Sequence, residues 1–334
     1  MEKDTRQRQL NLWSKAKISA IDGENSDYIW TMVSGDASFR RYFRWANDKC
    51  SYIAVDAPPE HENNPQFVNI ANMLDSLNAP KVLAYDFEQG FMLLSDLGDQ
   101  LFLPLLNDQT ADGLYRSAID ALIDMQAIKG AEQLPPYDQT LLMAEMELFR
   151  EWFIGKHLQL ELSPQEHQML DQLFDKLIDS ALQQPQVFVH RDYHSRNIMY
   201  RADQAPGIID FQDAVYGPIT YDLLSLLRDC YIQWPVEKVQ GWLDYYLQHT
   251  AFSVDKEQFS KWFDWMGLQR HIKVAGIFAR LNYRDGKSGY LKDIPLTLTY
   301  IVQQAEKYPE LEPFSHWMRE KILPEWGKKR AVTL

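Results

Sequence analysis

The pattern of apolar residues changes once along this chain, in the short stretch LLSDLGD at residues 93–99. Before it, from residue 28 to about residue 85, apolar and polar residues alternate, which is typical of antiparallel strands. After it, apolar residues recur three and four positions apart, which indicates amphipathic helices. A chain of 334 residues is also longer than a single hydrophobic core usually grows. We therefore predict an α+β protein with a small, mostly antiparallel β lobe at residues 1–97 and a larger, mainly helical lobe at residues 98–334.

Two helices and one polar segment refine this division. The charged N-terminal stretch predicts an amphipathic helix at about residues 4–20, and a short helix at about residues 66–77 interrupts the strands. Residues 187–214 are the exception in the helical half, because three short apolar runs there predict strands separated by polar loops; the runs are 187–189, 198–200 and 207–209. Loops held by rigid strands often carry binding and catalytic residues. This segment is therefore the first candidate site.

Composition limits the kinds of partner. The net charge of −13 argues against nucleic acid or an anionic membrane as the main partner, since both are bound by basic surfaces. The charged N-terminus and the absence of an apolar run of membrane-spanning length predict a cytoplasmic protein. The two cysteines, Cys50 and Cys230, have no spacing that suggests a disulfide framework or a zinc site. An anionic small molecule stays possible if arginines or metal ions supply positive charge locally.

The loops of residues 187–214 contain two motifs. His190-Arg191-Asp192 followed by Asn197 matches H-R-D-x-x-x-x-N, and Asp210-Phe211-Gln212 comes close to D-F-G. Either aspartate alone could cap a turn, but the order of the motifs on alternating strands and loops favours phosphoryl transfer. That reaction needs a carboxylate that accepts the proton of the acceptor hydroxyl, and hard oxygen ligands for magnesium.

With these motifs the sequence resembles the kinase-like phosphotransferases, specifically the aminoglycoside and choline phosphotransferase group. The resemblance spans nearly the whole chain and implies a two-lobed protein-kinase-like fold that uses ATP and Mg²⁺. It implies that Asp192 is the catalytic base and that Asn197 and Asp210 are the metal ligands.

The resemblance also suggests roles for residues around the motifs. His190 and Asp222 would support the catalytic loop, although Asp222 could simply cap a helix or belong to its first turn. The substrate-binding candidates are Arg191, His194, Asp213 and Arg284. For Arg284 and the nearby Lys287, a helix-ending turn with solvated charges is the slightly favoured alternative. We exclude zinc binding by His190 and His194, because their segment is not helical and lacks the glutamate of that motif.

A turn in SGDASFRRYFR is the candidate nucleotide-covering loop. Small residues between two predicted strands can bring backbone N–H groups close to phosphate, although the same stretch could be an ordinary hairpin turn. The nucleotide-binding candidates from this stretch and from LLSDLGD are Gly35, Asp36, Ala37, Ser38, Arg40, Arg41, Leu94 and Asp96.

One departure concerns the phosphate anchor. The small lobe of a kinase normally carries a lysine on its central strand, whereas the matching strand here reads YIAVDAPPE, with Asp56 near the expected position. Three explanations stay open: an arginine of the turn, such as Arg41, replaces the lysine; the nucleotide binds differently; or the protein is not a kinase.

A narrower resemblance suggests the acceptor. GDASFRRYFR, VDAPPE, HRDYHSRN and RLNYRDGKSGYLKDIP together are similar to the anomeric kinases of cell-wall recycling, which share the lysine-free strand. That family phosphorylates the C1 hydroxyl of N-acetylmuramate and N-acetylglucosamine, so an amino sugar and ATP are the expected partners. The alternatives are a phosphotransferase for another small alcohol, such as an aminoglycoside or choline, and a nucleotide-binding scaffold without catalysis.

Overall fold

The computed structural model describes residues 2–23, 27–34, 39–202 and 204–333. The chain forms two compact units, each described here by itself. The first combines Met1–Pro104 with Arg196–Asp213, and the second combines Leu105–Ser195 with Ala214–Leu334. The assignment of residues 1–97 and 98–334 to a nucleotide lobe and a substrate lobe stays a prediction.

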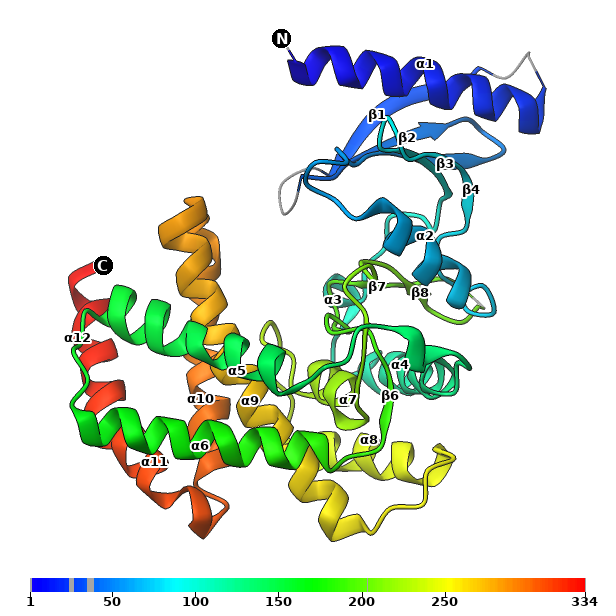
Figure 1. The fold of residues 1–334 in the computed structure, drawn as a ribbon. Helices are drawn as coiled ribbons and strands as arrows, with labels where there is room; N and C mark the ends of the chain where they lie inside the picture. The colour runs from blue at the N-terminus through cyan, green and yellow to red at the C-terminus, as the bar shows by residue number, and fades with distance from the viewer. Residues whose placement is uncertain (1, 24–26, 35–38, 203, 334) are drawn as a thin grey trace. The chain divides into compact units, whose positions relative to one another are not determined.

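A five-stranded antiparallel sheet forms the first unit, with strand order β1-β2-β3-β5-β4. Its strands are β1 (Ile29–Ser34), β2 (Arg41–Ala46), β3 (Ser51–Asp56), β4 (Val82–Asp86) and β5 (Phe91–Ser95). Side chains alternate between the two faces of a strand. Phe43, Trp45 and Leu93 face a core that helix α1 (Glu2–Asp22) completes with Leu10 and Ile18, and α1 lies along the sheet in Figure 1. The predicted N-terminal helix and antiparallel strands are confirmed.

The opposite face of this sheet meets shorter elements. Helix α2 (Asn64–Met73) follows β3; the Asn63 side chain accepts the Gln66 N–H and caps its N-terminus. Helix α3 (Phe102–Leu105) follows β5. A small hairpin of β7 (Ile198–Met199) and β8 (Gly207–Ile208) also belongs to this unit, because Met199 bridges to Leu101 and the Ile208 N–H donates to the Asn78 carbonyl. The strands predicted at 198–200 and 207–209 are therefore present, but they complete the N-terminal unit.

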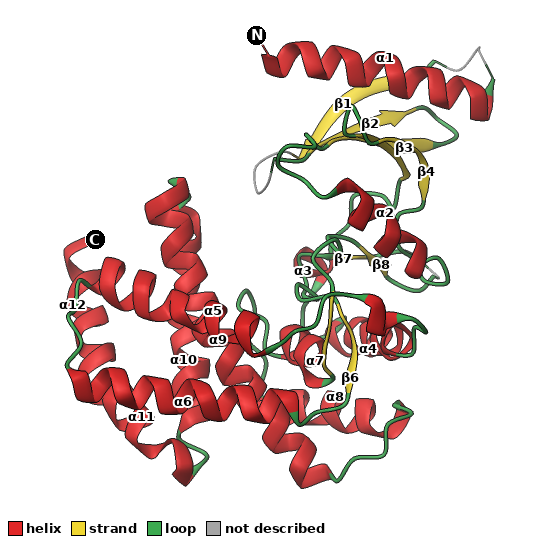
Figure 2. Cartoon of the chain, in the orientation of Figure 1, coloured by secondary structure: helices red, strands yellow, loops and turns green. Residues whose placement is uncertain are grey.

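Helices build the second unit, as Figure 2 shows in red. The α-helices are α4 (Ala111–Gln126), α5 (Gln139–Leu148), α6 (Pro164–Leu182), α7 (Thr220–Leu227), α8 (Val236–His249), α9 (Lys256–Asp285), α10 (Ile294–Ala305), α11 (Glu312–Trp317) and α12 (Leu323–Thr333). Shorter 3₁₀ segments are η1 (Ala131–Gln133), η3 (Ser288–Asp293) and η4 (Pro309–Leu311), and π-helical turns are η2 (Phe149–Leu158) and η5 (Met318–Ile322). Strands β6 (Gln186–Val189) and β9 (Val215–Pro218) pair antiparallel. Strand β9 was not predicted.

Helix α9 is the central element of this unit. It packs against α5, α6, α7 and α10, and most of its residues from Phe259 to Ala279 are buried. Gly276 allows α9 to approach α5 closely, because a Cβ atom at this position would lie 2.3 Å from the backbone of Leu148. A helix that is buried on all sides positions any polar side chain it carries rigidly. Among the described residues, no helix combines the length and apolar character needed to cross a membrane.

Candidate functional site

A cavity of about 460 Å³ lies within the first unit, a size typical of small-molecule sites. Strands β3 and β5 contribute Ile53 and Leu94, and the β7–β8 hairpin contributes Met199 and Ile209. The polar or charged lining residues include Arg40, Tyr42, Arg44, Ser95, Asp96, Asp99, Arg196, Asn197 and Asp210. Apolar walls and several charged groups are what a nucleotide requires, with the base on the apolar surface and the phosphates at the charged groups.

The two predicted metal ligands lie together at this cavity. Asn197 Nδ2 lies 3.3 Å from Asp210 Oδ2, and the Ile209 N–H donates to the Asn197 carbonyl at 3.2 Å. Asp210 has a φ of +66°, a left-handed conformation that is costly for most side chains. Gln212 Nε2 donates to Asp210 Oδ1 at 2.8 Å. One amide oxygen and one exposed carboxylate fit Mg²⁺, which keeps several positions for water and phosphate.

Arg40, which lines the same cavity, forms an ion pair with Glu62. Their N–O distance is 2.9 Å, and the side chains are only 5% and 10% exposed. Both charges act on the hydroxyl of the half-buried Tyr42. Burial raises its pKa; the Asp210 and Glu62 carboxylates raise the pKa further and Arg40 opposes them. Arg40 and Asp210, a predicted metal ligand, both line this cavity.

Arg44 ties the segment after β5 to the sheet. Its guanidinium donates to the Asp96 carboxylate at 2.6 and 3.0 Å and to the Gly98 carbonyl at 3.0 Å, and it pairs with Asp99. The two nucleotide candidates of this segment, Leu94 and Asp96, line the cavity. The Asp96 side chain is 3% exposed. Its carboxylate accepts hydrogen bonds from Arg44 and from the Gly98 N–H, so it stabilises the turn after β5.

Arg41 and Asp56 face away from this cavity. They are paired across β2 and β3, and Arg41 donates to Asp56 at 2.5 Å. Arg6 of α1 donates to the same carboxylate, also at 2.5 Å. The predicted contact of Arg41 with nucleotide therefore does not fit its place on the α1 side of the sheet, and Asp56 is the partner of two arginines. The four turn candidates Gly35, Asp36, Ala37 and Ser38 lie outside the described residues.

In the second unit, Asp222 holds the loop that contains the catalytic candidate. Its two carboxylate oxygens accept the backbone N–H groups of His190 at 2.6 Å and Arg191 at 3.0 Å. Asp222 lies in the first turn of α7 without capping it. Burial raises the pKa of Asp222 to about 7, although the two N–H groups oppose this. Arg191 has a φ of +74°, so Asp222 fixes the loop where the backbone is strained.

Asp192 is half-buried at the tip of this loop. The His190 ring accepts the Asp192 backbone N–H at 3.2 Å. Burial alone would raise the pKa of Asp192, but nearby cationic groups, first among them Lys273, outweigh burial and hold the pKa below its ordinary value. The carboxylate is therefore ionised at neutral pH and can accept a hydrogen bond from a hydroxyl group.

A buried cluster beside this loop was missed by the sequence analysis. Glu145 of α5 pairs with Arg191 and, at 2.8 Å, with Lys273 of α9; Tyr137 donates to it as well. Lys273 Nζ also lies 2.9 Å from the Tyr221 hydroxyl. The sequence signal that could have revealed the cluster is a charged residue within the apolar face of a predicted helix. Fully buried lysine and glutamate residues occur almost only in pairs, so such a residue predicts a buried partner of opposite charge. The predicted substrate-binding residue Arg191 thus forms an ion pair with a carboxylate of the protein itself.

The other substrate candidates lie at different places. His194 is buried, and its ring packs edge-on against Tyr231. Asp213 is exposed and is the last residue of the first unit's hairpin segment. Arg284 lies in the last turn of α9 and pairs with Asp285 at 2.8 Å. Since it follows Lys273 by 11 residues, it lies about 16 Å further along the helix, which fits the helix-ending turn better than a place beside Asp192.

Comparisons with known proteins identify the family of this chain. The sequence model described as the phosphotransferase enzyme family matches residues 29–260. An N-acetylmuramate/N-acetylglucosamine kinase from Pseudomonas putida KT2440 is 43% identical over 334 aligned residues, covering 96% of this chain and 97% of that protein. A protein of the same name from Pseudomonas aeruginosa PAO1 is 41% identical and covers 93% of this chain and 95% of its own length.

Solved structures confirm the fold. An ADP-bound aminoglycoside phosphotransferase superposes with a TM-score of 0.58 at 15% sequence identity, covering 86% of this chain and 98% of that structure. The predicted fold, with an antiparallel N-terminal sheet and a mainly helical remainder as in protein-kinase-like phosphotransferases, is therefore correct.

Proposed function

This chain belongs to the phosphotransferase enzyme family, and from that premise we propose that it phosphorylates the anomeric C1 hydroxyl of N-acetylmuramate and N-acetylglucosamine with ATP, in peptidoglycan recycling. The observation that carries the proposal is the pair of relatives with that kinase name, which are 43% and 41% identical over almost their whole length. Their similarity to this chain is not confined to the nucleotide motifs, so the acceptor-binding parts are included.

The cavity of the first unit would hold ATP. Its base would lie against the apolar walls formed by Ile53, Leu94 and Met199, with its phosphates toward Asn197 and Asp210. These two side chains would hold Mg²⁺, which neutralises charge on the transferring phosphoryl group. The ADP-bound relative of the same fold supports nucleotide use, and an ATP donor fits the predicted cytoplasmic location.

Asp192 would act on the acceptor. Its lowered pKa makes it a weak base, which suffices for an anomeric hydroxyl because this group is more acidic than the other hydroxyls of a sugar. Asp192 would orient the C1 hydroxyl for attack on the γ-phosphorus and take its proton as the O–P bond forms and ADP leaves. Asn197 follows Asp192 by five residues in the sequence.

A panel of acceptors tests this proposal. ADP release is measured with ATP and Mg²⁺ in the presence of N-acetylmuramate, N-acetylglucosamine, an aminoglycoside or choline. We expect release with the two amino sugars alone. ADP formation with only the aminoglycoside or choline would keep the phosphotransferase chemistry and overturn the proposed acceptor. Nucleotide binding without ADP formation for any acceptor would favour a nucleotide-binding scaffold.

A further inference from the structure

Strand β3 cannot supply the usual phosphate anchor. Its sequence, SYIAVD, contains no lysine or arginine. Ile53 of this strand lines the cavity, whereas Asp56 is bound by Arg6 and Arg41 on the other face of the sheet. Some other cation must therefore reach the phosphates if this cavity binds ATP.

Three arginines line the described part of the cavity: Arg40, Arg44 and Arg196. Arg44 is held by Asp96 and Asp99 at the segment after β5. Arg40 is different, since Glu62, the carboxylate that holds it, is not among the residues that line the cavity, whereas Asp210, one of the two proposed metal ligands, is. Phosphates bound beside Asp210 would share this cavity with the Arg40 guanidinium.

Glu62 gives Arg40 a fixed position. The pair is nearly buried, with an N–O distance of 2.9 Å, and the Arg40 guanidinium also lies over the Phe67 ring at 5.6 Å from its centre. A guanidinium has five N–H donors and can bind a carboxylate and a phosphate oxygen at once. In protein kinases the strand lysine is held in the same manner by a helix glutamate.

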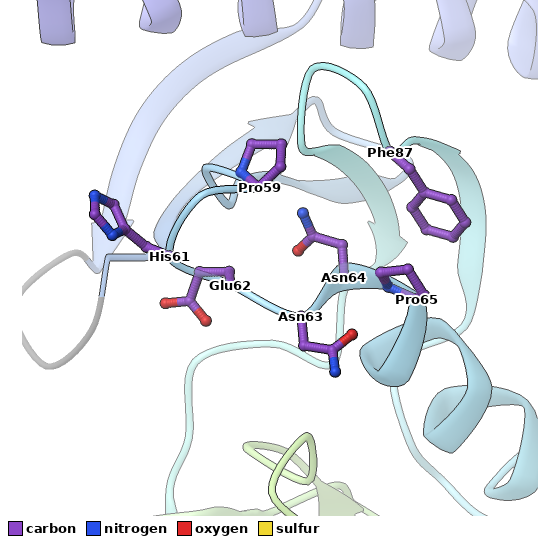
Figure 3. A pocket seen from close by; sticks show the side chains of 7 residues that line it. All are labelled: Pro59, His61, Glu62, Asn63, Asn64, Pro65 and Phe87. Atoms are coloured by element: carbon purple, nitrogen blue, oxygen red, sulfur yellow. The ribbon is translucent and has the colours of Figure 1, made fainter.

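The segment that carries Glu62 is itself anchored. The His61 and Glu62 N–H groups donate to the Pro58 carbonyl, and Asn64 Nδ2 donates to the Ala57 carbonyl at 2.8 Å. Figure 3 shows His61 and Glu62 projecting from this segment away from Phe87. A buried ion pair contributes little to stability by itself, so a pair held this firmly beside a cavity suggests a binding role.

We propose that Arg40, positioned by Glu62, binds the ATP phosphates in place of the absent strand lysine. This inference rests on the proposed use of ATP but not on the identity of the acceptor. It makes Arg40 a nucleotide-binding residue and Glu62 a positioning residue.

Calorimetric titration with ADP–Mg²⁺ and with adenosine, without acceptor, tests the assignment. Arg40→Met should weaken ADP binding by about 10- to 100-fold, because it removes hydrogen bonds between charged groups. Adenosine, which has no phosphate, should bind as it does to the wild type. Arg40→Lys should recover part of the ADP affinity, and Glu62→Gln should lose less than Arg40→Met. Arg6→Gln, on the α1 side of the sheet, is the control and should leave both affinities unchanged.

Two results would overturn the assignment. Equal losses of affinity for ADP and adenosine would show that the Arg40–Glu62 pair only shapes the cavity. Unchanged ADP affinity in Arg40→Met would assign phosphate binding to Arg44 or Arg196 instead. Thermal melting of each variant monitors folding; if Arg40→Met does not fold, Arg40→Lys and Glu62→Gln, which alter the pair more mildly, answer the same question. Failure of the wild type to bind ADP would instead contradict the proposed function.

Discussion

Lys273 Nζ lies 2.8 Å from the Glu145 carboxylate in the interior of the helical unit. The same carboxylate binds Arg191, the residue before Asp192. Although burial alone would raise its pKa, Lys273 and Arg191 hold the pKa of Glu145 below its ordinary value. One glutamate on α5 thus pairs with two cations, one from α9 and one from the catalytic loop.

Glu145→Gln should therefore be strongly destabilising. Removing one partner of a buried charge cluster costs about 3–5 kcal/mol, and here two cations lose a common carboxylate. Urea unfolding measures this change. Glu147→Gln, on the same helix with a 40% exposed side chain, is the matched control and should change stability by less than about 0.5 kcal/mol. Similar small losses in both variants would mean that the cluster does not support the loop.

Asp192→Asn should abolish most turnover and leave the fold intact. The amide has nearly the same shape but cannot take the acceptor proton, and general base catalysis contributes about 100-fold or more. Steady-state kcat and thermal melting are measured together on the purified variant. A rate near that of the wild type would refute the assignment of Asp192 as the base.

Asp210→Asn should remove the magnesium dependence of nucleotide binding. Asparagine tolerates the left-handed backbone at this position, so the substitution removes charge without adding strain. ADP affinity is measured by calorimetry with Mg²⁺ and with a chelator. We expect the variant to bind equally under both conditions; a magnesium effect as large as that of the wild type would exclude Asp210 as a ligand.

Asp222 should make folding stability depend on pH. Its pKa is raised from about 3.8 to about 7 in the folded protein, so the folded state retains a proton that the unfolded chain releases. This contribution is complete below the unfolded pKa and is lost as pH rises through about 7. Relative to Asp222→Asn, the wild type should lose about 2 kcal/mol between about pH 5.5 and about pH 8. Denaturant unfolding of both proteins at the two pH values measures this difference, and parallel changes would contradict the raised pKa.

Local patterns predicted much of this structure. The three apolar runs at residues 187–209 became β6, β7 and β8, because short apolar segments between polar turns have few other ways to be buried. The two motifs predicted Asn197 and Asp210 as partners at one site, and Asn197 Nδ2 lies 3.3 Å from Asp210 Oδ2. Asp222 holds the loop of His190 and Arg191, as the resemblance suggested.

Contacts between residues far apart in the sequence could not be predicted from these local patterns. Periodicity says nothing of the bond from the Ile208 N–H to the Asn78 carbonyl, which joins the β7–β8 hairpin to the N-terminal unit. The faces of Arg40 and Arg41 differ because successive residues of an extended strand point to opposite sides. Glu145 and Lys273 meet only because α5 and α9 pack together.

The position of the phosphate on the product tests the central claim most directly. Phosphorus NMR is recorded on the product formed from N-acetylmuramate, ATP and Mg²⁺. The account predicts a phosphomonoester whose phosphorus couples to the anomeric proton. Coupling to a proton at another carbon, or a phosphate signal from ATP hydrolysis alone, would contradict it.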